Sequence, residues 1–223
     1  MISVSQAVER RISTRAFRPD PVPEAVVRDI LERAARAPSG GNLQPWRVWA
    51  LAGAPLAEFK ALAHERLTAG PPEEREYHVY PDDLWEPMRS RRYQAGADLY
   101  ATIGIPREDK AGRLAQFAKN ADFFGAPVGL FFCLDRKVGP PQWSDVGMYM
   151  QTVMLLAIEA GLATCAQEYW SLLPQTISAF LGMPDDHMVF SGMALGYPDD
   201  THPINTLRTQ REPLEGFAEL RGF

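Results

Sequence analysis

The chain has 223 residues, of which 46% are hydrophobic and 23% are charged, and its formal net charge is −5. This length suits one compact domain of about 100–250 residues, and the high apolar content argues against disorder. The excess of acidic residues makes nucleic acid and anionic membranes poor candidates as partners, because phosphate groups select basic surfaces.

The apolar stretches are short. The longest run over residues 126–134 and 148–157, whereas a helix that crosses a bilayer needs roughly 20 apolar residues. The N-terminus, MISVSQAVERR, is amphipathic and has no signal-peptide core. We therefore expect a soluble, cytoplasmic protein with a single domain over residues 1–223.

Hydrophobic periodicity predicts three helices and one strand in the first part of the chain. They follow in the order helix 5–11, helix 24–35, strand 46–52 and helix 55–67. Pro23 is expected in the first turn of the second helix. Residues 69–87 contain four prolines among aromatic and charged residues. This composition is typical of a surface loop that covers a binding site, so we expect a cap segment near 69–105.

The second half continues without regular alternation of strand and helix. The predicted order is helix 85–101, helix 108–122, strand 128–134, helix 145–161, strand 162–166, helix 174–181 and strand 188–195. Asp145 is expected to cap its helix and Gly161 to end it. This order favours an α+β fold over a doubly wound sheet. The tail from residue 199 onward is too irregular to form a core of its own.

The two cysteines lie in apolar segments, Cys133 in VGLFFCL and Cys165 in GLATCAQ. They suit buried hydrophobic positions in a reducing compartment, and a redox or metal pair is the alternative. The chain has no C-x-x-C motif, and its four histidines are scattered. The sequence therefore supports no metal site.

Three polar segments are candidates for binding. Arg10, Arg11, Ser13, Thr14 and Arg15 directly follow the first predicted helix. Guanidinium groups offer forked donors that match phosphate oxygens, so this segment suits a phosphate monoester. The alternative is a solvated, charged helix end.

The second segment is P-S-G-G-N-L-Q-P-W over residues 38–46. Its glycines allow close approach of the backbone to a ligand, while Asn42 and Gln44 carry both donors and acceptors. The alternative is an ordinary connection between a helix and a strand. The third segment, residues 208–213, adds Arg208 and Arg211 to the tail, either as part of a phosphate clamp or as a salt-bridged surface.

Side-chain catalytic groups are not recognisable in the sequence. Ser191-Gly192 is not part of a G-x-S-x-G nucleophile elbow, and no pair of carboxylates stands on a turn-rich loop. An enzyme built this way takes its reactive group from a cofactor, and the protein supplies binding, orientation and electrostatics.

Taken in this order, the segments resemble the FMN-dependent nitroreductase family. The matching pieces are Arg11–Phe17, Ala37–Trp46, Gly161–Gln167, Ala194–Tyr197 and Arg208–Pro213, so the resemblance extends from near residue 5 to near residue 220.

The finer resemblance is to the nitrobenzoate and dinitroaniline reductases, and residues 89–100 and 120–127 carry it. The family resemblance implies an α+β sandwich with a mainly antiparallel sheet and an intertwined homodimer, with two FMN sites at the subunit interface. The tail, residues 199–223, would then embrace the partner subunit.

The resemblance also assigns cofactor-binding residues. Arg11, the backbone of Ile12, Ser13 and Arg15 would hold the phosphate and ribityl chain of FMN, together with Arg208 and Arg211. Pro38, Ser39, Gly40, Asn42 and Gln44 would come from the other subunit. Asn120 would face the pyrimidine edge of the ring, and Gln167 and Glu168 would lie near N5 and the ring edge.

Three positions depart from the family pattern. Ile12 replaces a basic residue, Ala166 stands where many relatives have proline, and Glu168 places a carboxylate beside the ring edge. A negative charge there disfavours an anionic reduced flavin. Either the side chain turns away, or the redox potential and the substrates differ.

The resemblance implies an oxidoreductase that passes hydride from NADPH or NADH through flavin N5 to nitroaromatic or quinone-like acceptors with ping-pong kinetics. No protein residue would be catalytic in itself. The aromatic residues expected to shape the substrate slot are Tyr93, Phe123, Phe124 and Trp143, for most of which core packing is the alternative. The alternative functions are those of a flavin-dependent dehalogenase, an azoline dehydrogenase, a flavin-fragmenting enzyme or a non-catalytic flavin-binding dimer.

Overall fold

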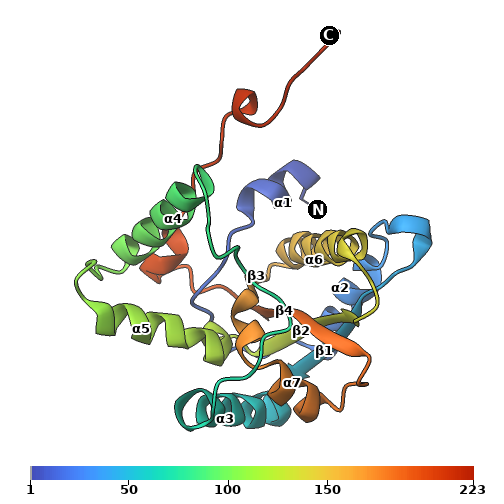
Figure 1. Cartoon of the computed structure of the whole chain (residues 1–223), viewed down its shortest axis with the longest axis vertical. Helices are drawn as coiled ribbons and strands as arrows, with labels where there is room; N and C mark the ends of the chain where they lie inside the picture. Colours follow the sequence, from blue (N-terminus) through green and yellow to red (C-terminus); the bar gives the residue numbers. More distant parts are fainter. Residues whose placement is uncertain (1) are drawn as a thin grey trace.

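A four-stranded antiparallel sheet lies at the centre of the computed structural model, which describes residues 2–223 (Figure 1). Its order is β1-β2-β4-β3, and the strands are β1 (Arg47–Ala52), β2 (Val128–Asp135), β3 (Ala163–Gln167) and β4 (His187–Gly196). All three pairings are antiparallel. The prediction of an α+β fold is confirmed, and each predicted strand end lies within one residue of the observed end.

One face of the sheet is covered by α3 (Gly53–Ala69), α7 (Pro174–Leu181) and the 3-10 helix η2 (Lys119–Gly125). The core on this face is strongly aromatic. Phe59 of α3 lies with its ring centroid 5.0 Å from that of Phe131 and 5.2 Å from that of Trp170. These large rings anchor α3 to the sheet by burying apolar surface.

The opposite face is covered by α2 (Glu24–Ala34) and α6 (Pro140–Glu159). Side chains of β2 alternate between the two cores: Leu130 and Phe132 point to α2 and α6, and Phe131 and Cys133 point to α3. Because β2 is buried on both faces, its sequence is a continuous apolar run. Both cysteines are buried and free of disulfides, as predicted.

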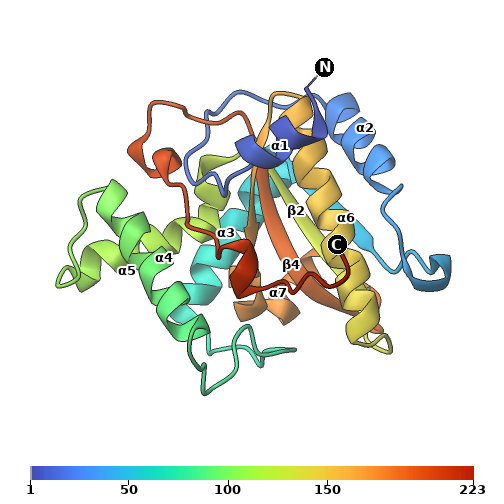
Figure 2. The ribbon, with the colours of Figure 1, turned by 90° about the horizontal axis from the view of Figure 1, so that it is seen from above.

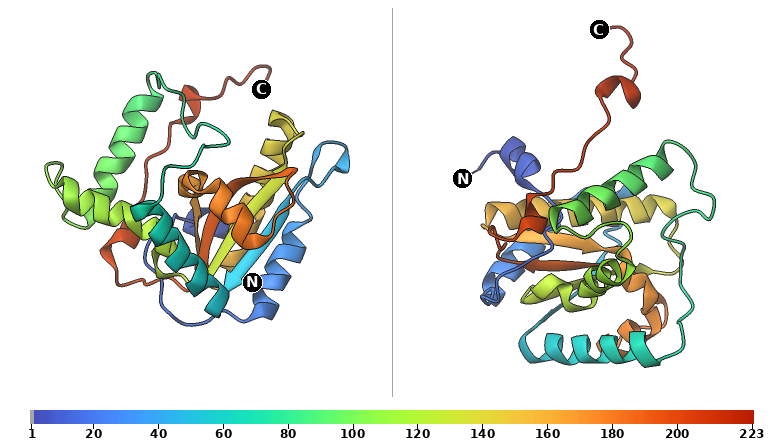
Figure 3. Two further views of the ribbon diagram at one scale, coloured as in Figure 1. Left: turned by 60° about the horizontal axis from the view of Figure 1, so that its bottom comes forward. Right: turned by 90° about the vertical axis from the view of Figure 1, so that its left-hand side faces the viewer.

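The remaining elements lie outside this sandwich. On one side, α4 (Met88–Thr102) and α5 (Lys110–Ala118) form a separate wall, as Figure 2 shows. The short helix α1 (Val4–Arg10) packs near α6, and η4 (Pro203–Thr206) packs near α4. Beyond η4 the tail, with η5 (Leu214–Gly216), projects away from the body (Figure 3).

Asp145 does not cap α6, and the prediction that it does was wrong. The helix begins five residues earlier, at Pro140, where proline is favoured because the first turn needs no backbone N–H donor. The N–H of Gly139 donates instead to Oε1 of Gln142 at 3.2 Å. Asp145 is buried and accepts the N–H of Gly40 at 3.3 Å. Gly161 follows the end of the helix with φ 74°, as predicted.

The position of one proline and the boundaries of two other helices were also predicted wrongly. Pro23 is the N-cap of α2 and lies one residue before its first turn. The helix predicted over 85–101 begins only at Met88, after Pro87. The helix predicted over 108–122 ends at Ala118 and gives way to η2, where Phe123 and Phe124 adopt φ values of 51° and 56°. Their rings enter the protein interior, and this burial offsets the backbone strain.

Candidate cofactor site

The arginine segments near the two ends of the chain are joined by Asn205. The backbone N–H of Arg15 donates to Oδ1 of Asn205 at 2.8 Å. Nδ2 of Asn205 donates to the carbonyls of Ala16 and Asp199, both at 2.9 Å. Asn205 is buried. Its amide therefore bridges segments that are 190 positions apart in the sequence.

The five arginines of these segments, Arg10, Arg11, Arg15, Arg208 and Arg211, have no carboxylate partner within residues 2–223. Side chains of Arg15, Arg208 and Arg211 donate to backbone carbonyls, and Arg211 also donates to Oγ1 of Thr209 at 2.6 Å. Burial and the charge of Arg211 lower the pKa of Arg11. A phosphate monoester can pair with several cations that are held close together without counter-charges. These residues therefore fit the phosphate group of an anionic cofactor.

Beside Arg15 lies a cavity of about 520 Å³, within the range of about 300–1,000 Å³ that is usual for ligand sites. Its wall includes the predicted residues Arg15, Asn120, Phe124, Gln167 and Glu168. The wall is completed by α4, α5 and the segment before α4, so the cavity lies between the sheet edge and the α4–α5 wall.

Gln167 and Asn120 form one connected amide pair. The buried Gln167 donates through Nε2 to the carbonyl O of Asn120 at 2.9 Å and to its Oδ1 at 3.1 Å. The indole N–H of Trp170 donates to Oε1 of Gln167 at 3.3 Å. The Gln167 side chain is thus fully engaged by the protein, and it fixes Asn120 at the cavity wall.

Glu168 follows β3 at the first position of the 3-10 helix η3 (Glu168–Leu172) and lines the cavity. Its side chain stays accessible, yet the surrounding protein raises the pKa of its carboxyl group through partial burial. Burial also raises the pKa of the Tyr77 hydroxyl, and the charge of Glu168 adds to that shift. The carboxylate therefore stands in surroundings that favour its neutral form.

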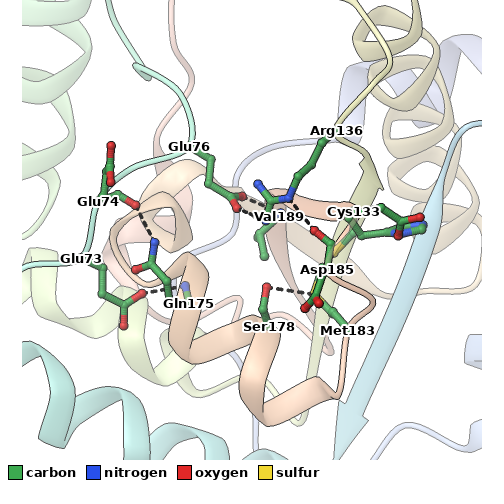
Figure 4. A network of polar contacts seen from close by, with 12 residues as sticks. Glu73, Glu74, Glu76, Cys133, Arg136, Gln175, Ser178, Met183, Asp185 and Val189 are labelled. Atoms are coloured by element: carbon green, nitrogen blue, oxygen red, sulfur yellow. Dashed lines mark hydrogen bonds and ion pairs between the residues drawn. The ribbon is translucent and has the colours of Figure 1, made fainter.

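A strap, defined here as residues 71–87, crosses from α3 to α4 and is fixed by its glutamates. The Glu73 carboxylate accepts the backbone N–H groups of Gln175 at 2.7 Å and Thr176 at 3.2 Å at the start of α7. The Thr176 hydroxyl donates to the same carboxylate, and Arg66 lies 3.7 Å from it. The carbonyl of Glu74 accepts from Nε2 of Gln175 at 2.9 Å (Figure 4).

Glu76 fixes the next part of the strap to β4, as Figure 4 shows. Its carboxylate accepts the backbone N–H of Val189 at 3.0 Å and pairs with Arg136. Tyr77 donates to the carbonyl of Phe190. Because β3 pairs with β4 only from Gly192 onward, these side chains satisfy backbone groups on the edge of β4 that β3 leaves free. The strap thereby places Arg75, Val79 and Tyr80 at the cavity.

The Nitroreductase family model matches residues 8–197 of the chain. The chain belongs to the nitroreductase family. The resemblance inferred from the sequence is thereby confirmed.

Relatives and solved structures support the same family assignment. A 4-nitrobenzoate reductase from Pseudomonas putida is 37% identical over 97% of this chain and 94% of its own length. The structure of an FMN- and NADPH-dependent nitroreductase, NfnB from Sphigopyxis sp. strain HMH, superposes with a TM-score of 0.96 at 45% identity and covers 100% of both chains. NfnB from Mycobacterium smegmatis, solved in complex with NADPH, gives a TM-score of 0.90 at 30% identity over 98% of this chain and 99% of its own. The nitroreductase fold is thus confirmed.

Residues 38–44, which the resemblance assigns to the site of the other subunit, stand away from the cavity of their own chain. They lie with η1 (Gly40–Asn42) beside the N-terminal half of α6, on the opposite side of the body from α4 and α5 (Figures 1 and 2). Asn42 and Gln44 have φ values of 57° and 49°. The hydroxyl of Ser39 accepts the N–H of Gln44 at 3.0 Å, which holds this strained turn in place.

Ile12 and Ser13 lie in the connection from α1 to α2, which passes beside β3. Ser13 forms an isolated bridge with Thr164 of β3, and the carbonyl of Ser13 accepts from the Arg15 guanidinium at 3.3 Å. This connection carries the predicted phosphate-binding residues past the edge of the sheet toward the cavity.

The four aromatic residues expected at the substrate slot lie in four different places. Phe124 lines the cavity, whereas Tyr93 lines a neighbouring one. Phe123 is fully buried against Trp170, and Trp143 packs between Tyr77 and Phe190. For the last two, the structure shows the core packing that the sequence left as an alternative.

Sequence reasoning missed most of the cavity wall, including Arg75, Tyr80 and Arg92. The guanidinium of Arg92 lies 4.2 Å from the centroid of the Tyr80 ring. The signal in the sequence was the expected cap segment near 69–105, which contains all three residues but gives no indication of which side chains turn inward. Within residues 2–223, no group of His, Cys, Asp or Glu gathers as a metal site, and no helix is long and apolar enough to span a bilayer.

Proposed function

We propose that the chain is an FMN-dependent NAD(P)H oxidoreductase that reduces nitroaromatic and quinone-like acceptors with ping-pong kinetics. The observation that carries this proposal is the set of arginines without carboxylate partners, Arg11, Arg15, Arg208 and Arg211, of which Arg15 lines a cavity of about 520 Å³. The 4-nitrobenzoate reductase and the FMN- and NADPH-dependent nitroreductase to which the chain is similar support it.

Bound FMN would supply the redox chemistry, accepting electrons from NAD(P)H and delivering them to the acceptor. The arginine set would hold the phosphate, because guanidinium groups pair with it through charge-assisted hydrogen bonds. Asn120, fixed by Gln167, would offer its amide to the pyrimidine edge of the ring. No side chain of the cavity needs to act as nucleophile.

Use of this cavity by both the nicotinamide of the donor and the acceptor explains why the two would bind in turn. Its wall contains Phe124, Tyr80 and Tyr169, which suit planar aromatic ligands, and Arg75 and Arg92, which suit anionic groups. A slot of this size takes one such ligand above a flavin at a time. The strap and α4 would cap it and exclude bulk water.

We also propose that the functional unit is a homodimer in which residues 38–44 complete the partner's cavity. These residues do not reach their own cavity, and the tail carries exposed apolar side chains that have no cover within residues 2–223. Apolar groups of this kind mark a protein interface. The exposed tail residues are Leu214, Phe217, Leu220 and Phe223.

The test is the visible spectrum of the purified protein, followed without oxygen during addition of NADPH and then of 4-nitrobenzoate. We expect a bound flavin that is bleached by the donor and restored by the acceptor. A colourless protein that fails to bind added FMN would refute the proposal. Bleaching by neither NADPH nor NADH would support a non-catalytic flavin protein, and turnover of a halophenol in place of the nitro compound would support a dehalogenase.

A further inference from the structure

A second cavity, of about 560 Å³, lies beside the first. The two share Arg92 and Gly96 of α4 in their walls, so the cavities adjoin each other. The second cavity is formed by the end of the strap, one face of α4 and the start of α5. Four arginines line it: Arg89, Arg92, Arg107 and Arg113.

These arginines are held in place by aromatic rings and carbonyls rather than by carboxylates. The guanidinium carbon of Arg113 lies 4.3 Å from the centroid of the Tyr100 ring, and that of Arg107 lies 5.1 Å from the centroid of the Tyr93 ring. The Nε atoms of Arg89 and Arg113 donate to the carbonyls of Leu84 at 2.8 Å and Pro106 at 3.1 Å. Stacking and a single Nε bond orient a guanidinium and leave its terminal nitrogens free to bind a ligand.

The charges in this wall do not cancel. Two carboxylates, Asp82 and Asp83, face four guanidinium groups. Within residues 2–223, Asp82 pairs only with His78, at 3.7 Å, and none of the four arginines forms an ion pair. An excess of oriented arginines without counter-charges is a site for a ligand with phosphate groups, which the planar fork of arginine binds in two-pronged fashion.

We propose that this second cavity binds the 2′-phosphoadenosine end of NADPH and so makes the enzyme prefer NADPH to NADH. The proposal rests on the proposed function, since it places the nicotinamide end of the same molecule in the first cavity. Tyr93, 55% exposed, offers the adenine a ring face beside Arg107. Arg107 and Arg113 take the 2′-phosphate.

An aromatic acid is the less suitable occupant of the second cavity. A nitrobenzoate has one ring and one charge, and the first cavity already provides aromatic walls with Arg75 and Arg92. The second cavity has four arginines, which is more cations than one carboxylate can pair with. A dinucleotide with several phosphate charges matches both the two adjoining cavities and the number of cations.

The experiment compares the wild type, Arg107→Gln, the double variant Arg107→Gln with Arg113→Gln, and the control Arg28→Gln. Arg28 is exposed on α2 and pairs only with Glu24 within residues 2–223. Calorimetric titrations of the FMN-loaded protein with adenosine 2′,5′-bisphosphate and with adenosine 5′-monophosphate measure binding without turnover. Steady-state kinetics with nitrobenzene as acceptor give kcat/KM for NADPH and for NADH.

In the double variant, we expect binding of the bisphosphate to weaken about tenfold relative to the monophosphate, and the NADPH-to-NADH ratio of kcat/KM to fall by a similar factor. Arg107→Gln should give part of both effects, and it keeps the test valid if loss of the Arg113 contact with Pro106 unfolds the double variant. The control should stay within about twofold of the wild type.

Unchanged discrimination between the two adenosine ligands in both variants would overturn the proposal. So would an unchanged NADPH-to-NADH ratio, or an effect confined to the ratio of 4-nitrobenzoate to nitrobenzene, which would assign the arginines to the acceptor. A wild type that binds the bisphosphate but reduces no nitro compound would instead refute the proposed function and leave the adenosine site standing.

Discussion

Arginine and glutamate are used in opposite ways in two regions of this molecule. In the network of Figure 4, the Glu76 carboxylate is matched by Arg136 and by the backbone N–H of Val189, and that of Glu73 by the N-terminus of α7. Around the two cavities, arginines are held by carbonyls and tyrosine rings. The first arrangement fixes the chain, and the second leaves charge available for a ligand.

The comparison shows that the partner of an arginine indicates its role better than its exposure does. Arg136 and Arg92 are both solvent-accessible, but Arg136 pairs with Glu76, and Arg92 lies over the ring of Tyr80. A paired cation holds two segments together and gains nothing from an anionic ligand. An unpaired one still carries its full capacity for charge-assisted hydrogen bonds.

The largest expected effect comes from removing unpaired arginines. In the double variant Arg15→Ala with Arg211→Ala, FMN affinity should fall by about 100-fold or more, because two charge-assisted bonds to the phosphate are lost. Flavin content after gel filtration and a fluorescence titration with FMN measure this effect. The dimer should persist, as light scattering would show.

Arg28→Ala is the matched control, since this exposed arginine is paired with Glu24. It should leave FMN affinity within about twofold of the wild type. Unchanged FMN affinity in the double variant would refute the assignment of the two arginines to the phosphate.

A smaller effect is expected in the paired network. Glu73→Ala removes a carboxylate whose side chain is 4% exposed and leaves the N–H groups of Gln175 and Thr176 without their acceptor. The free energy of unfolding should fall by about 1–3 kcal/mol, as for the loss of a helix cap with buried partners. Urea denaturation of the FMN-loaded protein measures it.

The neighbouring substitution Glu74→Ala provides the control. Within residues 2–223, Glu74 contributes its backbone carbonyl to the network, and its side chain forms no ion pair. Its unfolding free energy should change by less than about 0.5 kcal/mol. Equal losses in the two variants would contradict the assignment of capping to the Glu73 carboxylate.

The smallest effect concerns Glu168, a carboxylate at the cavity that belongs to neither arrangement. Burial raises its pKa, so the folded state favours the neutral carboxyl group. As the pH rises above the pKa that Glu168 has in the unfolded chain, ionisation of this carboxyl group begins to destabilise the folded state. The destabilisation is complete above the raised pKa of Glu168 in the folded state. Glu168→Gln should therefore be more stable than the wild type at neutral pH and equal to it in acid.

Denaturant midpoints measured across this pH range check the sign. The gain should be small, because the side chain remains accessible to solvent. A variant that is less stable than the wild type at neutral pH would show that the carboxylate has a stabilising partner.

The sequence was most informative where a residue's role is local. Alternation and apolar runs located all four strands, and Gly161 marked the end of α6. Local rules failed at Phe123 and Phe124, where burial in the core outweighs the backbone preference that would have continued the helix. They failed at Asp145 because an aspartate can cap a helix or, inside a helix, accept a hydrogen bond from a distant loop. Asp145 does the second and accepts the backbone N–H of Gly40.

The candidate site divides in the same way. The arginine segments and residues 38–46 were recognisable because clusters of charge and loops rich in glycine, asparagine and proline are visible in a few consecutive residues. Arg75, Tyr80 and Arg92 were not. The inward position of Arg75 and Tyr80 depends on how Glu73 and Glu76 fix the strap to α7 and β4, and Arg92, on α4, lies over the Tyr80 ring.

By itself, the sequence determined the fold class, the family resemblance and the residue types that can hold a phosphate. Only the tertiary structure decided which charges are paired. Asn205 brings together arginines from the two ends of the chain, and Tyr93 and Tyr100 lie under arginines more than ten residues away. Propensity and periodicity act over a few residues, whereas the pairing of charges is set by topology, and that pairing separates structural arginines from those left free to bind a ligand.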